Sequence, residues 1–284
     1  MSTQLETYLE AAAGDLPAIP TIAARVMQAV DDPNTSRDHL QALIEQDASL
    51  ASRVLAVSNS VMYGYSGRVE TLNQAIGLVG SRVVRNLVLG ISLQSVFRRF
   101  DLMEKLLWTH STLAGPVTEA VARSLGTGID TDGAFTAGLL HDIGKSALAN
   151  SHHDEYEQVV ARVYNDKISF VEAERDQFGF DHAELGAMIA VKWNLPPHLI
   201  HVIRNHHSPD AAGDPGKEVG YLTLMVSLAT ACLTQQGVGR REPARGLRIA
   251  DHPAWKRLGL PDSDVEPILQ VCADQITRAK TLLG

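Results

Sequence analysis

The sequence is poor in aromatic residues, in cysteine and in long apolar runs, and each shortage narrows the class of protein. Aromatic residues make up only 5% of the 284 residues, so the core must rest on Leu, Val, Ile and Ala. The two cysteines, Cys232 and Cys272, are far apart in the sequence, which argues against a disulfide framework and favours a reducing compartment. The longest nearly uncharged apolar stretch, residues 221–233, is too short to span a bilayer.

The N-terminus and the charge balance exclude further classes. The first residues lack a basic segment followed by a long apolar one, so they do not resemble a signal peptide. The net charge of −8 argues against a general nucleic-acid binder, which would normally carry a basic surface. We therefore expect a cytoplasmic protein that has no membrane partner and no general affinity for nucleic acid.

Apolar residues recur at helical spacing along nearly the whole chain. Ile22, Val26, Met27 and Val30 form one such stripe, and longer helices are expected over residues 102–125, 182–193 and 217–236. Thr71-x-x-Gln74 and Ser169-x-x-Glu172 have the spacing of capping boxes. No strand alternation and no internal repeat is evident, so the predicted fold class is all-α.

Histidine is unevenly distributed. Nine of the 11 histidines lie between residues 110 and 207, and they are His110, His141, His152, His153, His182, His198, His201, His206 and His207. The chain can be divided near residues 98–103, which predicts a helical subdomain over 1–100 and a second over 101–284. Histidine is the commonest metal ligand and a frequent acid or base, so the second subdomain is expected to contain a site.

The strongest local motif is Gly138-Leu-Leu-His141-Asp142-Ile-Gly144-Lys145. An imidazole beside a carboxylate suits Fe, Mn, Zn or Mg. Adjacent residues of a helix diverge by about 100°, so one ion can meet both only at a helix end or bend, which Gly144 would permit. The alternative is a pair on the surface at a helix terminus.

The surroundings of this pair resemble the HD superfamily of metal-dependent phosphohydrolases. Over roughly residues 14–235 the chain is similar to an HDOD-domain protein, the HD-related output domain of bacterial signalling, and the remainder is a C-terminal helical extension. The similarity is carried by Leu16-Pro-Ala-Ile-Pro20, residues 44–50 and 53–60, Ala75-Ile-Gly-Leu-Val-Gly80, Trp108-Thr-His110-Ser, the His-Asp segment, residues 178–186 and Trp193-Asn-Leu-Pro196. The resemblance implies an N-terminal helical bundle packed on an HD-like helical domain.

The resemblance also implies roles for individual residues. Asp142 would bridge two ions, and Lys145 would contact a substrate phosphate, so these two would be catalytic only in an active enzyme. The full set of implied metal ligands is His110, His141, Asp142, His182, His206 and His207. From the residues alone, each has another explanation. His110 could be a buried structural histidine held by hydrogen bonds, and Asp181-His182 could cap the helix that follows. His206-His207 could lie at a helix C-terminus, where the helix dipole favours histidine.

Two departures from the related HD-GYP phosphodiesterases bear on activity. Thr230 stands where a further aspartate is expected, and the Gly-Tyr-Pro motif is absent. Three hypotheses follow from this pattern. The preferred one is a regulatory module of bacterial signalling, in circuits of the cyclic di-GMP kind, that contacts signalling proteins and has a degenerate or partly retained metal site. The others are an active phosphohydrolase on nucleotides or cyclic dinucleotides, and a nucleotide sensor without turnover.

Overall fold

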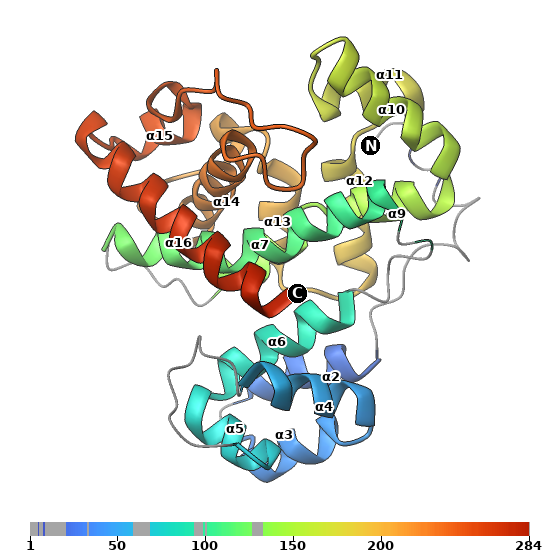
Figure 1. Ribbon diagram of the computed structural model, residues 1–284, viewed down its shortest axis with the longest axis vertical. Helices are drawn as coiled ribbons and strands as arrows, with labels where there is room; N and C mark the ends of the chain where they lie inside the picture. The colour runs from blue at the N-terminus through green and yellow to red at the C-terminus, as the bar shows by residue number, and fades with distance from the viewer. Residues whose placement is uncertain are drawn as a thin grey trace. The chain divides into compact units, whose positions relative to one another are not determined.

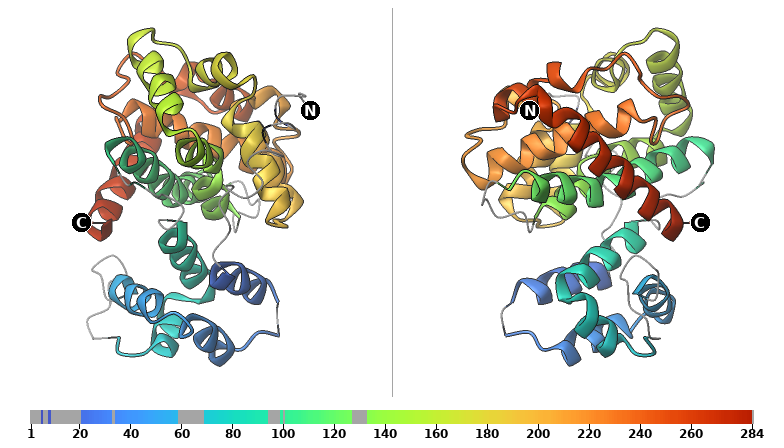
Figure 2. Two further views of the ribbon diagram at one scale, coloured as in Figure 1. Left: turned by 90° about the vertical axis from the view of Figure 1, so that its right-hand side faces the viewer. Right: turned by 60° about the vertical axis from the view of Figure 1, so that its left-hand side comes forward.

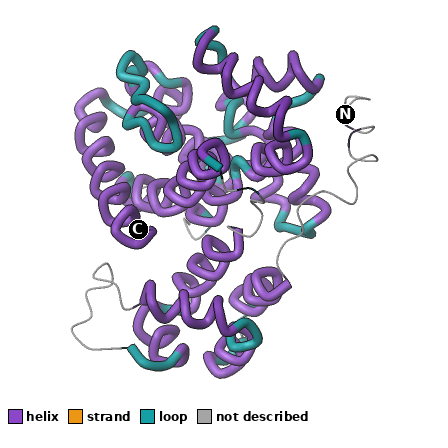
Figure 3. The backbone as a smooth tube through the Cα atoms, turned by 45° about the vertical axis from the view of Figure 1, so that its right-hand side comes forward, coloured by secondary structure: helices purple, strands orange, loops and turns teal. Residues whose placement is uncertain are grey.

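The computed structural model describes residues 21–58 (without 33), 69–93, 101–126 and 133–283, together with Leu5, Tyr8 and Arg99. Every regular element in these ranges is a helix, which confirms the predicted all-α class (Figure 3). The chain forms two compact units (Figure 1). The N-terminal unit comprises Ala18–Val96 and Arg278–Gly284, and the C-terminal unit comprises Met1–Pro17 and Phe97–Thr277.

Thr71 and Ser36 each cap the start of a helix in the N-terminal unit. Thr71 and Gln74 form the predicted capping box, with the Thr71 hydroxyl accepting from the Gln74 amide at 3.2 Å and the Gln74 side chain accepting from the Thr71 amide at 3.2 Å. Ser36 likewise accepts from the His39 amide at 3.1 Å. The helices are α2 (Thr21–Asp31), α3 (Arg37–Ile44), α4 (Ala48–Ser58), α5 (Leu72–Val79) and α6 (Ser81–Leu93).

Aliphatic side chains fill the core of the N-terminal unit, as the shortage of aromatic residues predicts. The side chains that are fully enclosed come from all five of these helices and include Val26, Ile44, Val54, Ala75 and Val84. Branched aliphatic residues at helical spacing are enough to bury one face of each helix.

The C-terminal unit contains the remaining helices (Figure 2). Their bounds are α7 (Leu102–Ser124), α8 (Ala134–Leu140), α9 (Ile143–Ser151), α10 (His153–Asn165), α11 (Phe170–Phe178), α12 (His182–Lys192), α13 (Pro197–Asn205), η3 (Pro209–Ala211), α14 (Glu218–Gln235), η4 (Ile249–Asp251), α15 (Pro253–Leu258), η5 (Asp262–Asp264) and α16 (Val265–Leu283). The three longer helices predicted from the sequence correspond to α7, α12 and α14, and each predicted bound agrees with the observed one within one residue.

Close helix packing brings four segments of the C-terminal unit together. A Cβ atom at Gly138 would lie 2.5 Å from the Ala114 carbonyl oxygen, so glycine is what lets α8 approach α7. Tyr221 on the buried helix α14 donates a hydrogen bond to the Ala122 carbonyl of α7 at 3.0 Å. Helix α12 packs against both α9 and α13. The histidines therefore meet at one interior point, which faces the middle of α7, the α8–α9 turn, the start of α12 and the end of α13.

The two cysteines, although 40 positions apart in the sequence, are both free and buried on α14 and α16. A hydrogen bond with the Cys272 thiol, together with burial, raises the pKa of the Cys232 thiol well above its usual value. Both cysteines pack as small apolar side chains.

Among the helices that the structure describes, none is by itself long and apolar enough to cross a membrane. Taken together, α5 and residues 81–92 of α6 have the length and apolar composition of a membrane span, but the chain bends by 115° between the two helices.

Candidate metal centre

His141 and Asp142 lie in the short turn between α8 and α9, at a helix end as their adjacency requires. Gly144 follows in the first turn of α9, where a Cβ atom would overlap the His182 carbonyl oxygen. The glycine therefore serves the close approach of α9 to α12, and the bend itself falls at His141 and Asp142. This approach places His182 Nε2 3.2 Å from Asp142 Oδ1.

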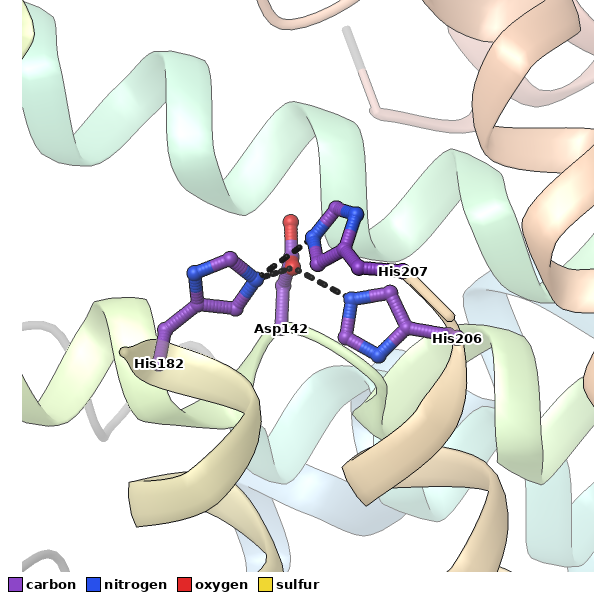
Figure 4. Close-up of side chains that lie close together, drawn as sticks. All are labelled: Asp142, His182, His206 and His207. Atoms are coloured by element: carbon purple, nitrogen blue, oxygen red, sulfur yellow. Dashed lines mark hydrogen bonds and ion pairs between the residues drawn. The ribbon is translucent and has the colours of Figure 1, made fainter. Parts of the chain in front are cut away.

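Asp142 is the centre of the cluster, and each of its oxygens faces a different group of imidazoles. Figure 4 shows one of these groups, formed by His182, His206 and His207. Its Oδ1 lies 3.2 Å from His182 Nε2 and 3.6 Å from His206 Nε2. Its Oδ2 lies 3.2 Å from His141 Nε2 and 3.8 Å from His110 Nε2. The side chains come from α7, the α8–α9 turn, the start of α12 and the end of α13.

His207 completes the Oδ1 group, since its Nε2 lies 2.8 Å from His182 Nε2. It is the exposed member of the cluster, while His110, His141, Asp142, His182 and His206 are buried. The structure thus brings together all six residues that the resemblance implied as ligands, and their ligand atoms form two groups within 4.8 Å.

The outer nitrogen of each buried imidazole has an acceptor that fixes its tautomer. His141 Nδ1 donates to the Gly138 carbonyl at 2.6 Å, and His206 Nδ1 donates to the Ile203 carbonyl at 2.8 Å. His110 Nδ1 faces the Val238 carbonyl at 3.4 Å. Because Nδ1 then carries the proton, the Nε2 lone pair of each ring is directed toward Asp142, as in metal-binding histidines.

The inward atoms are left without hydrogen bonds in the part of the chain that the structure describes. They are the Nε2 atoms of His110, His141 and His206 and the Oδ1 atom of Asp142. A buried polar atom without a partner costs about 1–3 kcal/mol, and four that point at one another are not a stable packing arrangement. A divalent cation is the partner that such atoms lack, so the residues present fit a metal ion.

The protonation states suit the same purpose. Burial lowers the pKa of His110 to about 3 and that of His206 to about 4, despite the neighbouring carboxylate. Burial also works to raise the pKa of Asp142, but His141 and Lys145 outweigh it and hold that pKa well below its usual range. At neutral pH His110 and His206 are therefore neutral imidazoles beside an ionised Asp142, which is the form of each that binds metals.

Glu174 on α11 was not identified from the sequence, and it contacts the cluster from outside. The residue is fully buried. Its Oε2 accepts from His182 Nδ1 at 2.5 Å and from the His182 amide at 2.9 Å, and its Oε1 accepts from the Tyr156 hydroxyl at 2.8 Å. Burial works to lower the pKa of His182, but Glu174 outweighs it and raises that pKa to about 9.

Lys145 and Thr230 differ in their relation to the cluster. Lys145 is buried, and its Nζ donates to Asp142 Oδ2 at 2.8 Å. Thr230, the position where a further carboxylate was expected, donates its hydroxyl to the Val226 carbonyl of its own helix at 2.8 Å. Among the described residues, Asp142 is the one carboxylate in the two ligand groups around these imidazoles.

His153 and His201 lie outside the cluster and have partners of their own. His153 is buried with Nε2 3.1 Å from Asp101 Oδ2, and His201 Nε2 lies 3.1 Å from the Ala212 carbonyl. His153, Asp101 and Glu157 form a second small group of ligand-type atoms at the start of α10.

Comparison with known proteins places this architecture in a family. A curated relative from Treponema pallidum, described as an uncharacterized protein, is 26% identical over 242 residues, which cover 82% of this chain. The match spans 44% of that relative, so this chain is similar to less than half of its length.

Solved structures share the fold over nearly the whole chain. A protein from Geobacter sulfurreducens, described as an HDOD domain protein with unknown function, has a TM-score of 0.78 and 27% identity and covers 98% of this chain and 96% of its own. A putative phosphohydrolase from Shewanella amazonensis SB2B has a TM-score of 0.75 and 22% identity and covers 100% and 99%. The model of the HDOD domain family matches residues 16–209, a range that includes all six residues of the cluster. The chain therefore belongs to the HDOD domain family.

Proposed function

We propose that this chain is a metal-binding regulatory module of bacterial signal transduction, whose output passes through contacts with other signalling proteins. The observation that supports metal binding is the set of buried, unpartnered Nε2 and Oδ1 atoms around Asp142. Membership of the HDOD family supports the signalling role, because the resemblance implies an output domain.

The donor set bears on the identity of the ion. Five imidazoles and a single carboxylate favour Fe, Zn or Mn over Mg, which prefers oxygen ligands and retains water. His110, His141, Asp142, His182, His206 and His207 would hold the ion. When bound, such an ion can polarise a phosphoryl oxygen or acidify a water molecule.

The preference for a regulatory role over turnover rests on the shortage of carboxylates. Two-ion phosphodiester chemistry uses two divalent ions that together stabilise the attacking and leaving oxygens. In the described part of the chain Asp142 alone provides an anionic ligand here, and the Thr230 hydroxyl is engaged with its own helix. With a single carboxylate, the site is better suited to binding an ion than to holding the two divalent ions that phosphodiester hydrolysis uses.

An active phosphohydrolase is the second candidate, and one observation favours it. The two oxygens of Asp142 face separate imidazole groups, which is the arrangement of a bridging carboxylate. The third hypothesis, a nucleotide sensor without turnover, would use the Lys145 ammonium for a phosphate group.

Elemental analysis of protein purified without a histidine tag or added metal tests metal binding. We expect metal in the purified chain and its loss in Asp142→Ala, while an empty wild-type chain would contradict the proposal. The same two proteins, incubated with Mn²⁺ or Fe²⁺ and a panel of nucleotides and cyclic dinucleotides, test turnover. Hydrolysis by the wild type that disappears in Asp142→Ala would replace the regulatory role with the enzymatic one.

A titration calorimetry experiment separates the sensor from the other two functions. Cyclic dinucleotide is titrated into wild type and Lys145→Ala. Binding that is lost in the variant, without turnover, would favour the sensor. Absence of binding at millimolar ligand leaves the regulatory module.

A further inference from the structure

The two oxygens of Asp142 have different neighbours. Among the described residues, the ligand-type groups on the Oδ1 side are the imidazoles of His182 and His206, with His207 beside them. On the Oδ2 side the closest neighbour is a cation, because Lys145 Nζ lies 2.8 Å away, nearer than the Nε2 atoms of His141 and His110. The two halves of the cluster are therefore not equivalent as binding sites for an ion.

Lys145 is held in this position from both sides. It stands three residues after Asp142, in the first turn of α9, so its side chain reaches back to the carboxylate. Its ammonium group also lies 4.4 Å from the centroid of the Phe170 ring, a favourable cation–π contact. With 8% of its side chain exposed, Lys145 cannot simply turn its charge into solvent.

The charges of the surroundings limit how many ions the cluster can hold. Once His182 is neutral, as a metal ligand must be, the described groups around the cluster comprise two buried carboxylates, Asp142 and Glu174, against the ammonium of Lys145, which leaves a single negative charge. Asp181, beside His182, is already paired with Arg175 at 2.7 Å. One divalent ion would leave the interior with one excess positive charge and two ions would leave three, and unbalanced charge is costly in a dry interior.

The geometry points to a centre that holds one divalent ion on the Oδ1 side of Asp142, where the Lys145 ammonium takes the place of a second ion on the Oδ2 side. This inference rests on the proposed metal centre and adds its stoichiometry and the role of Lys145. Lys145 acts as an internal counter-cation: it satisfies Oδ2, and its charge opposes the entry of another ion toward His110 and His141.

The test is a count of Mn²⁺ ions in the full chain. Wild type, Lys145→Met, Lys145→Arg and the control Lys217→Met, an exposed lysine of the same unit, are stripped with a chelator and equilibrated with Mn²⁺. The buffer contains no phosphate, since an anion at the site would supply the missing negative charge. Elemental analysis gives the number of ions per chain, and electron paramagnetic resonance distinguishes an isolated Mn²⁺ from a magnetically coupled pair.

We expect one uncoupled Mn²⁺ in wild type, in Lys145→Arg and in Lys217→Met, and two coupled Mn²⁺ in Lys145→Met, in which the charge is gone and the length of the side chain is kept. One ion in wild type and one in a folded Lys145→Met would overturn the role of Lys145. Two ions in wild type would overturn the inference even where Lys145→Met does not fold, while leaving the metal centre in place. No ion in any of the four proteins would overturn the metal centre itself.

Discussion

Glu174 controls which nitrogen of His182 faces the cluster. One of its oxygens accepts from His182 Nδ1 and from the His182 amide, and the other accepts from Tyr156. A carboxylate that accepts from a ligand histidine fixes the ring and makes its other nitrogen a better donor to a metal. The residue therefore acts as a positioning group that does not itself touch the ion.

Replacing Glu174 by Gln keeps the shape of the side chain and removes its charge. We expect the affinity for a divalent ion to fall about 10–100-fold, because His182 loses the carboxylate that polarises it. Competition between the protein and a chelating dye for Zn²⁺ measures this change. Glu172→Gln, an exposed position on the same helix, is the matched control and should bind like wild type; equal affinities in Glu174→Gln and wild type would contradict the assignment.

Gly144 makes the close contact of α9 and α12 possible, because a Cβ atom there would overlap the His182 carbonyl oxygen. The obstacle is backbone, which cannot move aside as a flexible side chain would. We expect Gly144→Ala to lower the free energy of unfolding by about 1–3 kcal/mol or more, as overpacking does. Urea unfolding of the metal-free protein measures it.

Gly90, in the middle of α6, provides the comparison for that variant. Apart from the neighbouring residues of its own helix, no heavy atom of the described residues lies within 4 Å of a Cβ atom built at this position. Gly90→Ala should therefore stabilise the chain by about 0.5–1 kcal/mol, since alanine is the better helix former. If both variants changed stability in the same direction, the close approach at Gly144 would not be what requires glycine.

At the scale of single helices, α15 begins with an unusual cap. His252 precedes it, and its Nδ1 accepts a hydrogen bond from the Ala254 amide at 3.3 Å. Only the neutral ring can accept this bond, and burial lowers the pKa of His252 below its ordinary value. The helix start therefore depends on the protonation of one side chain.

The linkage between protonation of His252 and folding determines whether stability rises or falls with pH. A histidine whose pKa is lower in the folded state contributes stability that is complete above the unfolded value of about 6.5 and is lost as the pH falls through it. His252→Asn keeps a capping oxygen that does not titrate. The free energy of unfolding of wild type relative to His252→Asn should thus decrease between about pH 8 and about pH 5. A difference that is constant over this range would exclude the cap as a titrating contact.

Local chemistry made the elements predictable from the sequence. The Thr71 and Gln74 capping box was recognisable from its spacing, and the ends of α7 were predicted within one residue. Such features depend on residues within one helical turn of each other. The need for glycine at position 144 could not be predicted in this way. It arises from the His182 carbonyl on another helix, and no local sequence pattern contains that contact.

The candidate site was predictable only as far as its ligand-type residues. Histidines and the His141-Asp142 pair stand out by composition, but Glu174 looks like an ordinary helical glutamate. Its one signal is its place in the inward stripe of Phe170, Ala173 and Phe178, where a charge is out of place. The pairing of Cys232 with Cys272 was equally hidden, because it depends on how α14 and α16 pack.

At the scale of the whole molecule, the two compact units should respond differently to a metal ion. The residues around Asp142 come from α7, the α8–α9 turn, α12 and α13, all within the C-terminal unit. An ion on the Oδ1 side of Asp142 cross-links three of these segments, the α8–α9 turn, α12 and α13, and α7 packs directly against α9. The N-terminal unit contributes no residue to the two histidine groups among its described positions.

Hydrogen exchange read by mass spectrometry, with and without a saturating divalent ion, measures this response. An ion at 100 times its Kd stabilises the folded state by about 2.7 kcal/mol, so amides in α7, α9, α12 and α13 should exchange more slowly when it is bound. Amides in α2 to α6 should exchange at the same rate in both conditions. Asp142→Asn is the control, since it keeps the size of the side chain and removes the central charge, and protection in this variant should not depend on the ion. Slower exchange spread evenly over both units would show instead that the two respond to the ion as one cooperative body.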